Sequence, residues 1–225
     1  MTPPRDDEER PRTIEEARAL QARLARSVVR SDRLGPVHSV CGLDAHYGDD
    51  GRTAHAAAVV LDASTLAVIE RSVVRRAVDF PYVPGLLSLR EAPALLAALR
   101  ALRTKPDLLL CDGQGIAHPL RCGLASHVGL LADLPSIGVA KTRLLGAHRE
   151  PSPGRGAWEP LEDAGEEVGA VLRTREGVKP VYVSIGHRVG LATAIRWVLA
   201  CSPRFRIPEP LRAADRLSRA GAARG

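Results

Sequence analysis

PDLLLCDG, residues 106–113, decides the fold of this 225-residue chain. Four consecutive apolar residues, Leu108 to Cys111, follow a proline and an acid and end at Asp112 and Gly113. A short apolar run bounded by turn residues predicts a buried strand. The sequence on either side of this strand supplies the other elements of one sheet.

The order of these elements predicts an α/β fold. Three strands with short turns come first and indicate an antiparallel meander. A helix, the central strand, a second helix and a further strand follow, which together predict a mixed sheet flanked by helices in a single domain, the layout of the ribonuclease H-like fold. The predicted elements are helices at 13–34, 88–102, 121–132 and 191–201 and strands at 37–43, 54–61, 66–74, 108–112, 135–140, 168–173 and 178–184.

Two internal segments and the chain ends are predicted to be irregular. Residues 79–85 hold two prolines, and residues 146–165 are rich in glycine and proline. Residues 1–12 contain three prolines and seven charges, so a flexible tail is expected there. The Ala/Arg/Gly-rich residues 219–225 are predicted to be a second tail.

Composition favours one compact domain with a nucleic acid as a candidate partner. The net charge of +6 and the pI of about 9.6 suit a polyanion, although arginine-rich composition also follows from high-GC coding. The four cysteines lack C-x-x-C spacing, which predicts reduced, buried thiols. The N-terminus has no apolar signal region and no window approaches ~18 uninterrupted apolar residues, so a soluble, cytoplasmic protein is expected. No heptad pattern appears, and a monomer is expected.

Three acids are candidates for metal-assisted chemistry. Asp44 and Asp112 each end an apolar run, and Glu91 lies at the start of the helix between them. Carboxylates gathered at strand ends need cations to ionise together, and Mg²⁺ or Mn²⁺ prefers oxygen ligands. Each acid also has a structural interpretation: Asp44 and Asp112 as turn formers, and Glu91 as the partner of Ser88 in a capping box.

Four further side chains stand out. Lys141 follows the predicted strand at 135–140, where it could contact a phosphate or remain a surface charge. His118 and His127 are nine residues apart, which favours a structural or substrate hydrogen bond over metal ligation. Tyr82 lies between Pro81 and Pro84 on a stiff loop, where it could wedge into a base stack or fold over the core.

These motifs together resemble the endonuclease V family of deoxyinosine 3′-endonucleases. A single DG or PYVP would mean little, but the series covers roughly residues 13–218 in the order of the family. The matching stretches are GLDAHY around Asp44, PYVPGLLSLRE from Pro81 to Glu91, KPDLLLCDGQGIAHP from Lys105 to Pro119, GLASHVGLLADLPSIGVAKT from Gly123 to Thr142, VGAVLRTR, VKPVYVSIGH and RIPEPLRAADRLS.

The resemblance implies a specific activity and site. It implies a ribonuclease H-like nuclease domain at 13–218 that uses Mg²⁺, with Mn²⁺ as a substitute. The enzyme would cut the second phosphodiester bond 3′ to hypoxanthine in DNA, leaving 3′-hydroxyl and 5′-phosphate ends. The implied metal ligands are Asp44, Glu91 and Asp112; the catalytic set adds Lys141 and Asp215; and the implied substrate-binding residues are Tyr82, Pro84, Gly85, Gly113, His118 and Gly138.

The chain departs from the family pattern near Asp112. Many members have DGHG or DGNG where this chain has Gln114 in DGQG. Many bacterial members have HPR where Leu120 follows Pro119 here, with Arg121 one position later, which puts a phosphate contact in doubt. SPGH is replaced by SIGH at 184–187. Two alternatives stay open: the same chemistry on inosine in RNA, because 2′-hydroxyl recognition is not visible in the sequence, and an inactive inosine-binding protein.

Overall fold

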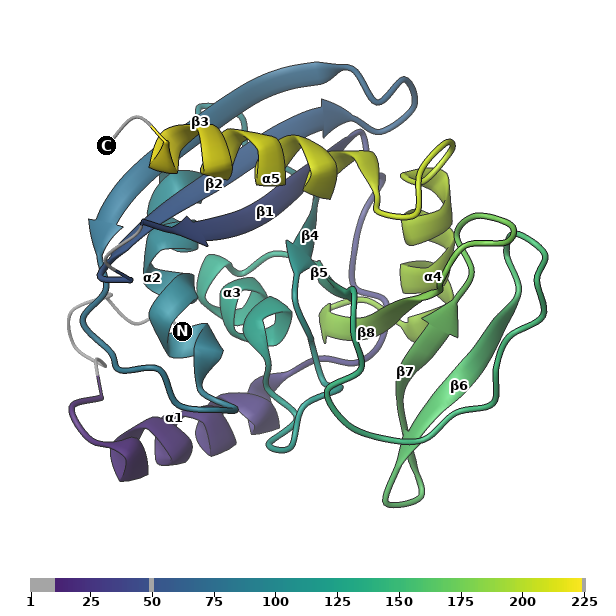
Figure 1. Cartoon of the computed structure of the whole chain (residues 1–225), viewed down its shortest axis with the longest axis horizontal. Helices are drawn as coiled ribbons and strands as arrows, with labels where there is room; N and C mark the ends of the chain where they lie inside the picture. Colours follow the sequence, from purple (N-terminus) through teal and green to yellow (C-terminus); the bar gives the residue numbers. More distant parts are fainter. Residues whose placement is uncertain (1–10, 49–50, 224–225) are drawn as a thin grey trace.

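The computed structural model describes residues 11–48 and 51–223 as an eight-stranded sheet covered by helices on both faces (Figure 1). The strand order is β3-β2-β1-β4-β5-β8-β7-β6. The strands are β1 (Ser39–Tyr47), β2 (Thr53–Asp62), β3 (Val68–Ala77), β4 (Leu108–Asp112), β5 (Ser136–Ala140), β6 (Trp158–Asp163), β7 (Glu166–Leu172) and β8 (Val181–His187), and the helices are α1 (Ile14–Ser27), α2 (Leu87–Arg100), α3 (Leu124–Ala132), α4 (Leu191–Ala200) and α5 (Glu209–Ala222).

The predicted meander and the predicted buried strand at 108–112 are confirmed, and that strand lies in the middle of the sheet. Strands β1, β2 and β3 pair antiparallel, while β4 lies parallel to both β1 and β5. Strands β5, β8, β7 and β6 then pair antiparallel in succession. The sheet is therefore mixed, and its parallel centre is β1-β4-β5.

The core lies on both faces of the sheet. On one face, alternate residues of β1, β2 and β4 pack against α2 and α3. On the other face, the central strands and β7 and β8 pack against α4, and α5 crosses β1 and β2 (Figure 1). The four cysteines are buried and free, as predicted. No helix within the described ranges is long and apolar enough to cross a membrane.

Several element boundaries differ from the sequence-based expectation. Helix α1 ends at Ser27, where the β-branched pair Val28 and Val29 continues in extended backbone, instead of reaching residue 34. The loop predicted at 146–165 contains the sixth strand, an edge strand that tolerates Pro160 because one side of its backbone needs no partner. Helix α5 was not predicted at all, and it includes residues 219–222 of the segment expected to be a tail. The N-terminal tail falls almost wholly outside the described residues.

Candidate active site

Asp44 and Asp112 are brought together by the parallel pairing of β1 with β4. Leu43 pairs with Cys111, so the two acids occupy the next position on neighbouring strands. Asp44 was expected to end its strand, but β1 continues to Tyr47 through its pairing with β2. The pairing with β4 stops at Leu43, and Asp44 therefore lies where the sheet opens.

Glu91 reaches the same point from α2. The helix begins at Leu87, so Glu91 lies in its second turn, and Leu86 at the N-cap position makes no side-chain capping bond. The capping-box interpretation of Ser88 and Glu91 is therefore wrong, because both residues lie inside the helix. The Glu91 side chain is buried, and Oε1 accepts a 3.3 Å hydrogen bond from the Tyr47 hydroxyl.

The electrostatics of Asp44, which is partly buried, and of buried Glu91 show that they share one negative region. Burial, together with the charges of Asp112 and Asp215, raises the pKa of Asp44 to about 7, against the hydrogen bond from Ser218. Burial likewise raises the pKa of Glu91 to about 8, with the charge of Asp44 as the next cause. The site therefore lacks positive charge for the carboxylates it holds.

Lys141 supplies one positive charge to this region. It follows β5 directly, and its Nζ lies 2.5 Å from Oδ2 of Asp112. Burial lowers the pKa of Lys141, but the hydrogen bond and charge of Asp112 outweigh this, so that its pKa is raised overall. The charges of Asp44 and Asp215 act in the same direction, which places Lys141 within the acidic group.

Helix α5 completes the group with Asp215 and with a residue that the sequence did not indicate. The Asp215 carboxylate accepts a 3.0 Å hydrogen bond from Nε of Arg219, one turn further on. Ser218, on the same helix, donates its hydroxyl to Oδ2 of Asp44 at 2.6 Å. Tyr47 and Ser218 were both missed, because nothing in the local sequence distinguishes them and α5 was not expected as a helix.

Each of the three predicted metal ligands contacts a donor from the protein itself. Ser218 contacts Asp44, Tyr47 contacts Glu91 and Lys141 contacts Asp112. Across residues 11–48 and 51–223, no three His, Cys, Asp or Glu side chains form a ready-made metal site. A cation would therefore have to share these carboxylates with their present donors or replace them.

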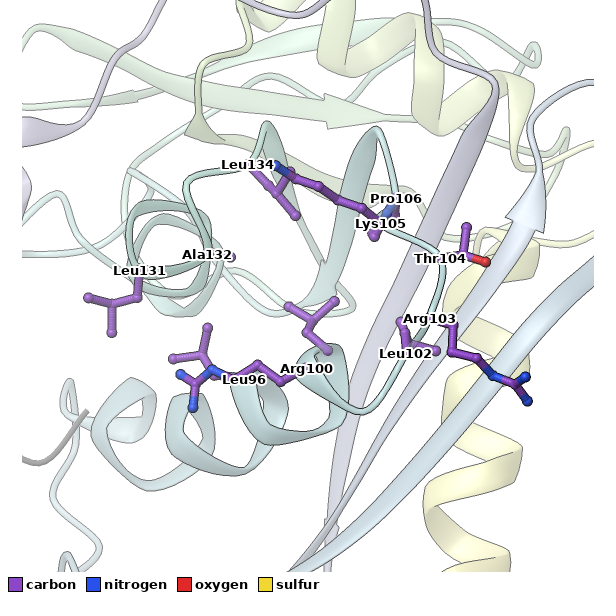
Figure 2. Close-up of a pocket in the computed structure, with 11 residues that line it drawn as sticks. Leu96, Arg100, Leu102, Arg103, Thr104, Lys105, Pro106, Leu131, Ala132 and Leu134 are labelled. Carbon is purple, nitrogen blue, oxygen red and sulfur yellow. The ribbon is translucent and has the colours of Figure 1, made fainter. Parts of the chain in front are cut away.

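The structure also contains a cavity of about 270 Å³ (Figure 2). It is lined by the C-terminal part of α2, by residues 102–106 before β4 and by the end of α3. Its lining includes Arg100, Arg103 and Lys105 and no acid, so it is separate from the carboxylate group.

The loop before α2 presents an aromatic ring to solvent. It has no regular structure, as predicted, and Tyr82 is 69% exposed. Pro84 is also exposed. Gly85 has a φ of +82°, and its carbonyl accepts hydrogen bonds from Nε2 of buried Gln21 on α1 at 3.2 Å and from Nε2 of His118 at 2.9 Å. The base of the Tyr82 loop is therefore fixed, and Val83 packs against the cluster formed with α1, while the Tyr82 ring itself is exposed.

His118 connects this loop to the segment after β4. Its Nδ1 accepts a hydrogen bond from the backbone of Leu120, which leaves Nε2 as the proton donor to Gly85. Burial lowers the pKa of His118, in agreement with a neutral ring. His127, by contrast, is buried in α3, away from this contact.

Gly113 and Gly138 lie against each other where the segment after β4 crosses β5. A Cβ at Gly138 would lie 2.6 Å from the Gly113 carbonyl oxygen and 2.5 Å from the Gly115 nitrogen. A Cβ at Gly113 would lie 3.2 Å from the Leu124 side chain. The backbone segments approach this closely because these positions carry no side chain.

The structure shows what Arg121 contacts beside Leu120, where the chain departs from the HPR motif of many bacterial members. Arg121 has a φ of +54°, and its guanidinium forms ion pairs with Asp163 at 2.8 Å and Glu166 at 2.7 Å. These contacts connect the segment after His118 to the β6–β7 turn. Arg121 therefore stabilises the contact between these two loops.

Comparison with known proteins identifies the family. The model of the Endonuclease V family matches residues 22–216. Endonuclease V of Roseiflexus sp. (strain RS-1) is 57% identical over 215 residues, covering 96% of each chain. The crystal structure of endonuclease V from Streptomyces avermitilis superposes with a TM-score of 0.92 at 48% identity, covering 96% of this chain and 95% of that one. A Ciona intestinalis endonuclease V, solved with a 24mer DNA containing an inosine followed by a ribo-adenosine, gives 0.82 at 29% identity over 94% and 98%. These matches confirm the ribonuclease H-like fold, and the chain belongs to the endonuclease V family of nucleases, which hydrolyse phosphodiester bonds.

Proposed function

We propose that this chain incises DNA beside deoxyinosine, the product of adenine deamination, as a cation-dependent repair endonuclease. The observation that carries this proposal is the convergence of Asp44, Glu91, Asp112 and Asp215 with Lys141 at the open end of the parallel strands. Membership of the endonuclease V family and the inosine-containing DNA bound by the Ciona relative support the substrate class. The net charge of +6 suits a polyanionic substrate.

The acidic group fits a hard divalent cation, Mg²⁺ or, as a substitute, Mn²⁺. Its donors are all carboxylate oxygens, the ligands that these ions prefer. Burial raises the pKa values of Asp44 and Glu91, and the charges of the neighbouring acids act in the same direction. Asp44, Glu91 and Asp112 would hold the ion, which when bound would supply Lewis-acid stabilisation of the phosphate and activation of water.

The residues of the chain then have distinct roles. The Lys141 ammonium beside Asp112 would stabilise negative charge on the phosphate or orient the attacking water. Asp215 would add negative charge from α5 and help retain the cation. The cut would fall at the second phosphodiester bond on the 3′ side of the base and leave a 3′-hydroxyl and a 5′-phosphate.

We assign recognition of the damaged base to the Tyr82 loop and to the segment after β4. Tyr82, exposed at a proline-bounded tip, would stack into the gap left by the flipped nucleotide. Pro84, Gly85 and His118 would line one side of the base pocket, and Gly113 and Gly138 the other. Glycine at these positions allows backbone groups to approach a base edge.

Inosine-containing RNA is the second candidate substrate. The DNA bound by the Ciona relative carries a ribo-adenosine directly after the inosine, so a ribonucleotide is accepted at that position in that protein. The same carboxylates would serve both substrates, and discrimination would depend on contacts with the 2′-hydroxyl.

The test is incision of matched oligonucleotides, DNA and RNA, with and without inosine, in Mg²⁺, in Mn²⁺ and in chelator. We expect cation-dependent cutting of inosine-containing DNA, with Asp112→Ala as the inactive control. Cutting of RNA alone would select the second candidate, and binding without cutting of either would identify an inosine-binding protein. Activity that persists in chelator would refute the role of the cation.

We further propose that the protein works as a cytoplasmic monomer. Four buried, free cysteines suit a reducing compartment. Size-exclusion chromatography with light scattering would measure the mass, which for a monomer is 24.1 kDa; a mass of twice that value would contradict the expectation.

A further inference from the structure

The segment that carries Lys141 has no regular structure of its own. Strand β5 ends at Ala140, and residues 141–144 are exposed. The Lys141 side chain is 44% accessible, yet its ammonium reaches Asp112. A long, exposed lysine has many alternative rotamers, so its direction depends on how its backbone is held.

Two side chains donate hydrogen bonds to this backbone, one from an earlier and one from a later part of the sequence. Gln114, in the segment after β4, donates from Nε2 to the carbonyl oxygen of Thr142 at 3.2 Å. Arg206, in the segment before α5, donates from Nη2 to the carbonyl oxygen of Lys141 at 2.7 Å and to that of Pro180 at 2.9 Å. The two consecutive carbonyl groups after β5 are thus both bound by side chains from elsewhere.

Both side chains are well placed to act as fixed anchors. Gln114 is only 8% exposed, and its bond to Thr142 orients the amide so that Oε1 is buried without a partner among the described residues. The backbone of Arg206 is itself held, because its carbonyl accepts a 2.6 Å hydrogen bond from the buried Thr174 hydroxyl. A hydrogen-bond donor whose own position is fixed also fixes the position of the group that it binds.

We propose that Gln114 and Arg206 are positioning residues that direct the Lys141 ammonium to Asp112 by fixing the two carbonyl groups of Lys141 and Thr142. The inference rests on the role of Lys141 proposed above. It assigns a function to Gln114, where the chain departs from the more common family motif. Neither residue contacts the acids directly in the interactions described; each acts through the backbone of Lys141 and Thr142.

The first test compares variants of Gln114 in single-turnover incision of inosine-containing DNA with the full-length protein. Gln114→Met keeps the length but removes the donor. We expect its maximal incision rate to fall about tenfold to a hundredfold, with little change in the enzyme concentration that gives half of that rate, as misplacement of a catalytic group does. Gln114→His restores an N–H donor and should recover most of the rate. Arg206→Met should behave like Gln114→Met.

A double-mutant cycle separates positioning from a merely structural role. In a Lys141→Met background there is no ammonium to direct, so adding Gln114→Met should reduce the residual rate no further. The same fold loss in both backgrounds would overturn the proposal. Ser72→Ala is the stability control, because it removes a hydrogen bond to the Ala98 carbonyl between β3 and α2 and should leave the rate unchanged.

A second measurement needs no activity, so it distinguishes failure of this inference from failure of the proposed function. The chain has three lysines, Lys105, Lys141 and Lys179, whose ¹³C-methylated amines give separate NMR signals assignable by Lys→Arg variants. We expect the Lys141 signal to be broader than the other two and to narrow in Gln114→Met. An unchanged Lys141 signal would overturn the inference at any incision rate. Narrowing without loss of incision would support the positioning contacts and refute the catalytic role of Lys141.

Discussion

Replacing Asp44 by asparagine is expected to stabilise the cation-free protein while abolishing its nuclease activity. Asparagine keeps the shape of the side chain and an oxygen that can accept the hydrogen bond from Ser218. It removes a charge that is poorly compensated, because burial raises the pKa of Asp44 from 3.8 to about 7. The carboxylate therefore opposes folding wherever it is ionised.

The pH dependence has a definite sign. In the unfolded chain the Asp44 carboxyl loses its proton near pH 4, whereas in the folded protein it keeps the proton until about pH 7. The folded state binds more protons across this window, so the contribution of Asp44 to stability is greatest below pH 4 and is lost as the pH rises towards 7. A difference of about three pKa units corresponds to about 4 kcal/mol, and exposure of part of the side chain reduces this to roughly 2–4 kcal/mol.

The assay is thermal unfolding in chelator from pH 5 to pH 9. At pH 8, Asp44→Asn should melt roughly 5–15 °C above the unmodified protein, and the difference should shrink towards pH 5. Added Mn²⁺ should raise the melting temperature of the unmodified protein but not that of the variant. Asp62→Asn is the matched control: the hydroxyl of Ser64 lowers the pKa of Asp62, so this change should destabilise instead. If Asp44→Asn were no more stable at pH 8 in chelator, the inferred cost of burying the ionised Asp44 carboxylate would not exist.

Three other changes test separate parts of the site. Tyr82→Ala should weaken binding to inosine-containing duplex about tenfold, the scale of one lost stacking contact. The melting temperature should not change, since the ring is 69% exposed. Unchanged binding, measured by fluorescence anisotropy, would exclude Tyr82 from the interface. Asp112→Ala should reduce incision to background with an unchanged circular dichroism spectrum, and wild-type activity would exclude Asp112 from the catalytic residues. Gly42→Ala places a Cβ 2.1 Å from the Pro210 carbonyl oxygen, so α5 must shift. Chemical denaturation should show a free energy of unfolding that is lower by about 1–3 kcal/mol. An unchanged free energy of unfolding would show that α5 adjusts freely.

Strong local patterns made the centre of the fold predictable. The apolar runs that became β1 and β4 placed Asp44 and Asp112 at strand positions, and the parallel register then made them neighbours. What the runs could not show was that β1 continues beyond Asp44, because its last residues pair with β2 alone. The start of α2 was also displaced, since the turn at Gly85 lets the helix begin before Ser88.

The C-terminal part of the site was not predicted, although helix α5 is amphipathic. It buries Leu211, Ala214 and Ser218, spaced as on one face of a helix. Pro208 and Pro210 suggested an interrupted chain, although proline is well tolerated in a first helical turn. Asp215 was therefore known only through the family resemblance, and Ser218 was not found.

The hydrogen bond from Ser218 to Asp44 joins residues 174 positions apart in the chain. During synthesis, β1 leaves the ribosome long before α5 exists, and domains are made from the N-terminal end onward. Until α5 docks, the acidic group lacks Asp215, and the β2 residues Ala57 and Val59 lack their cover. A nascent or prematurely terminated chain would thus leave this face of β2 exposed to aggregation and proteolysis, and the acidic group would be assembled only once α5 has docked.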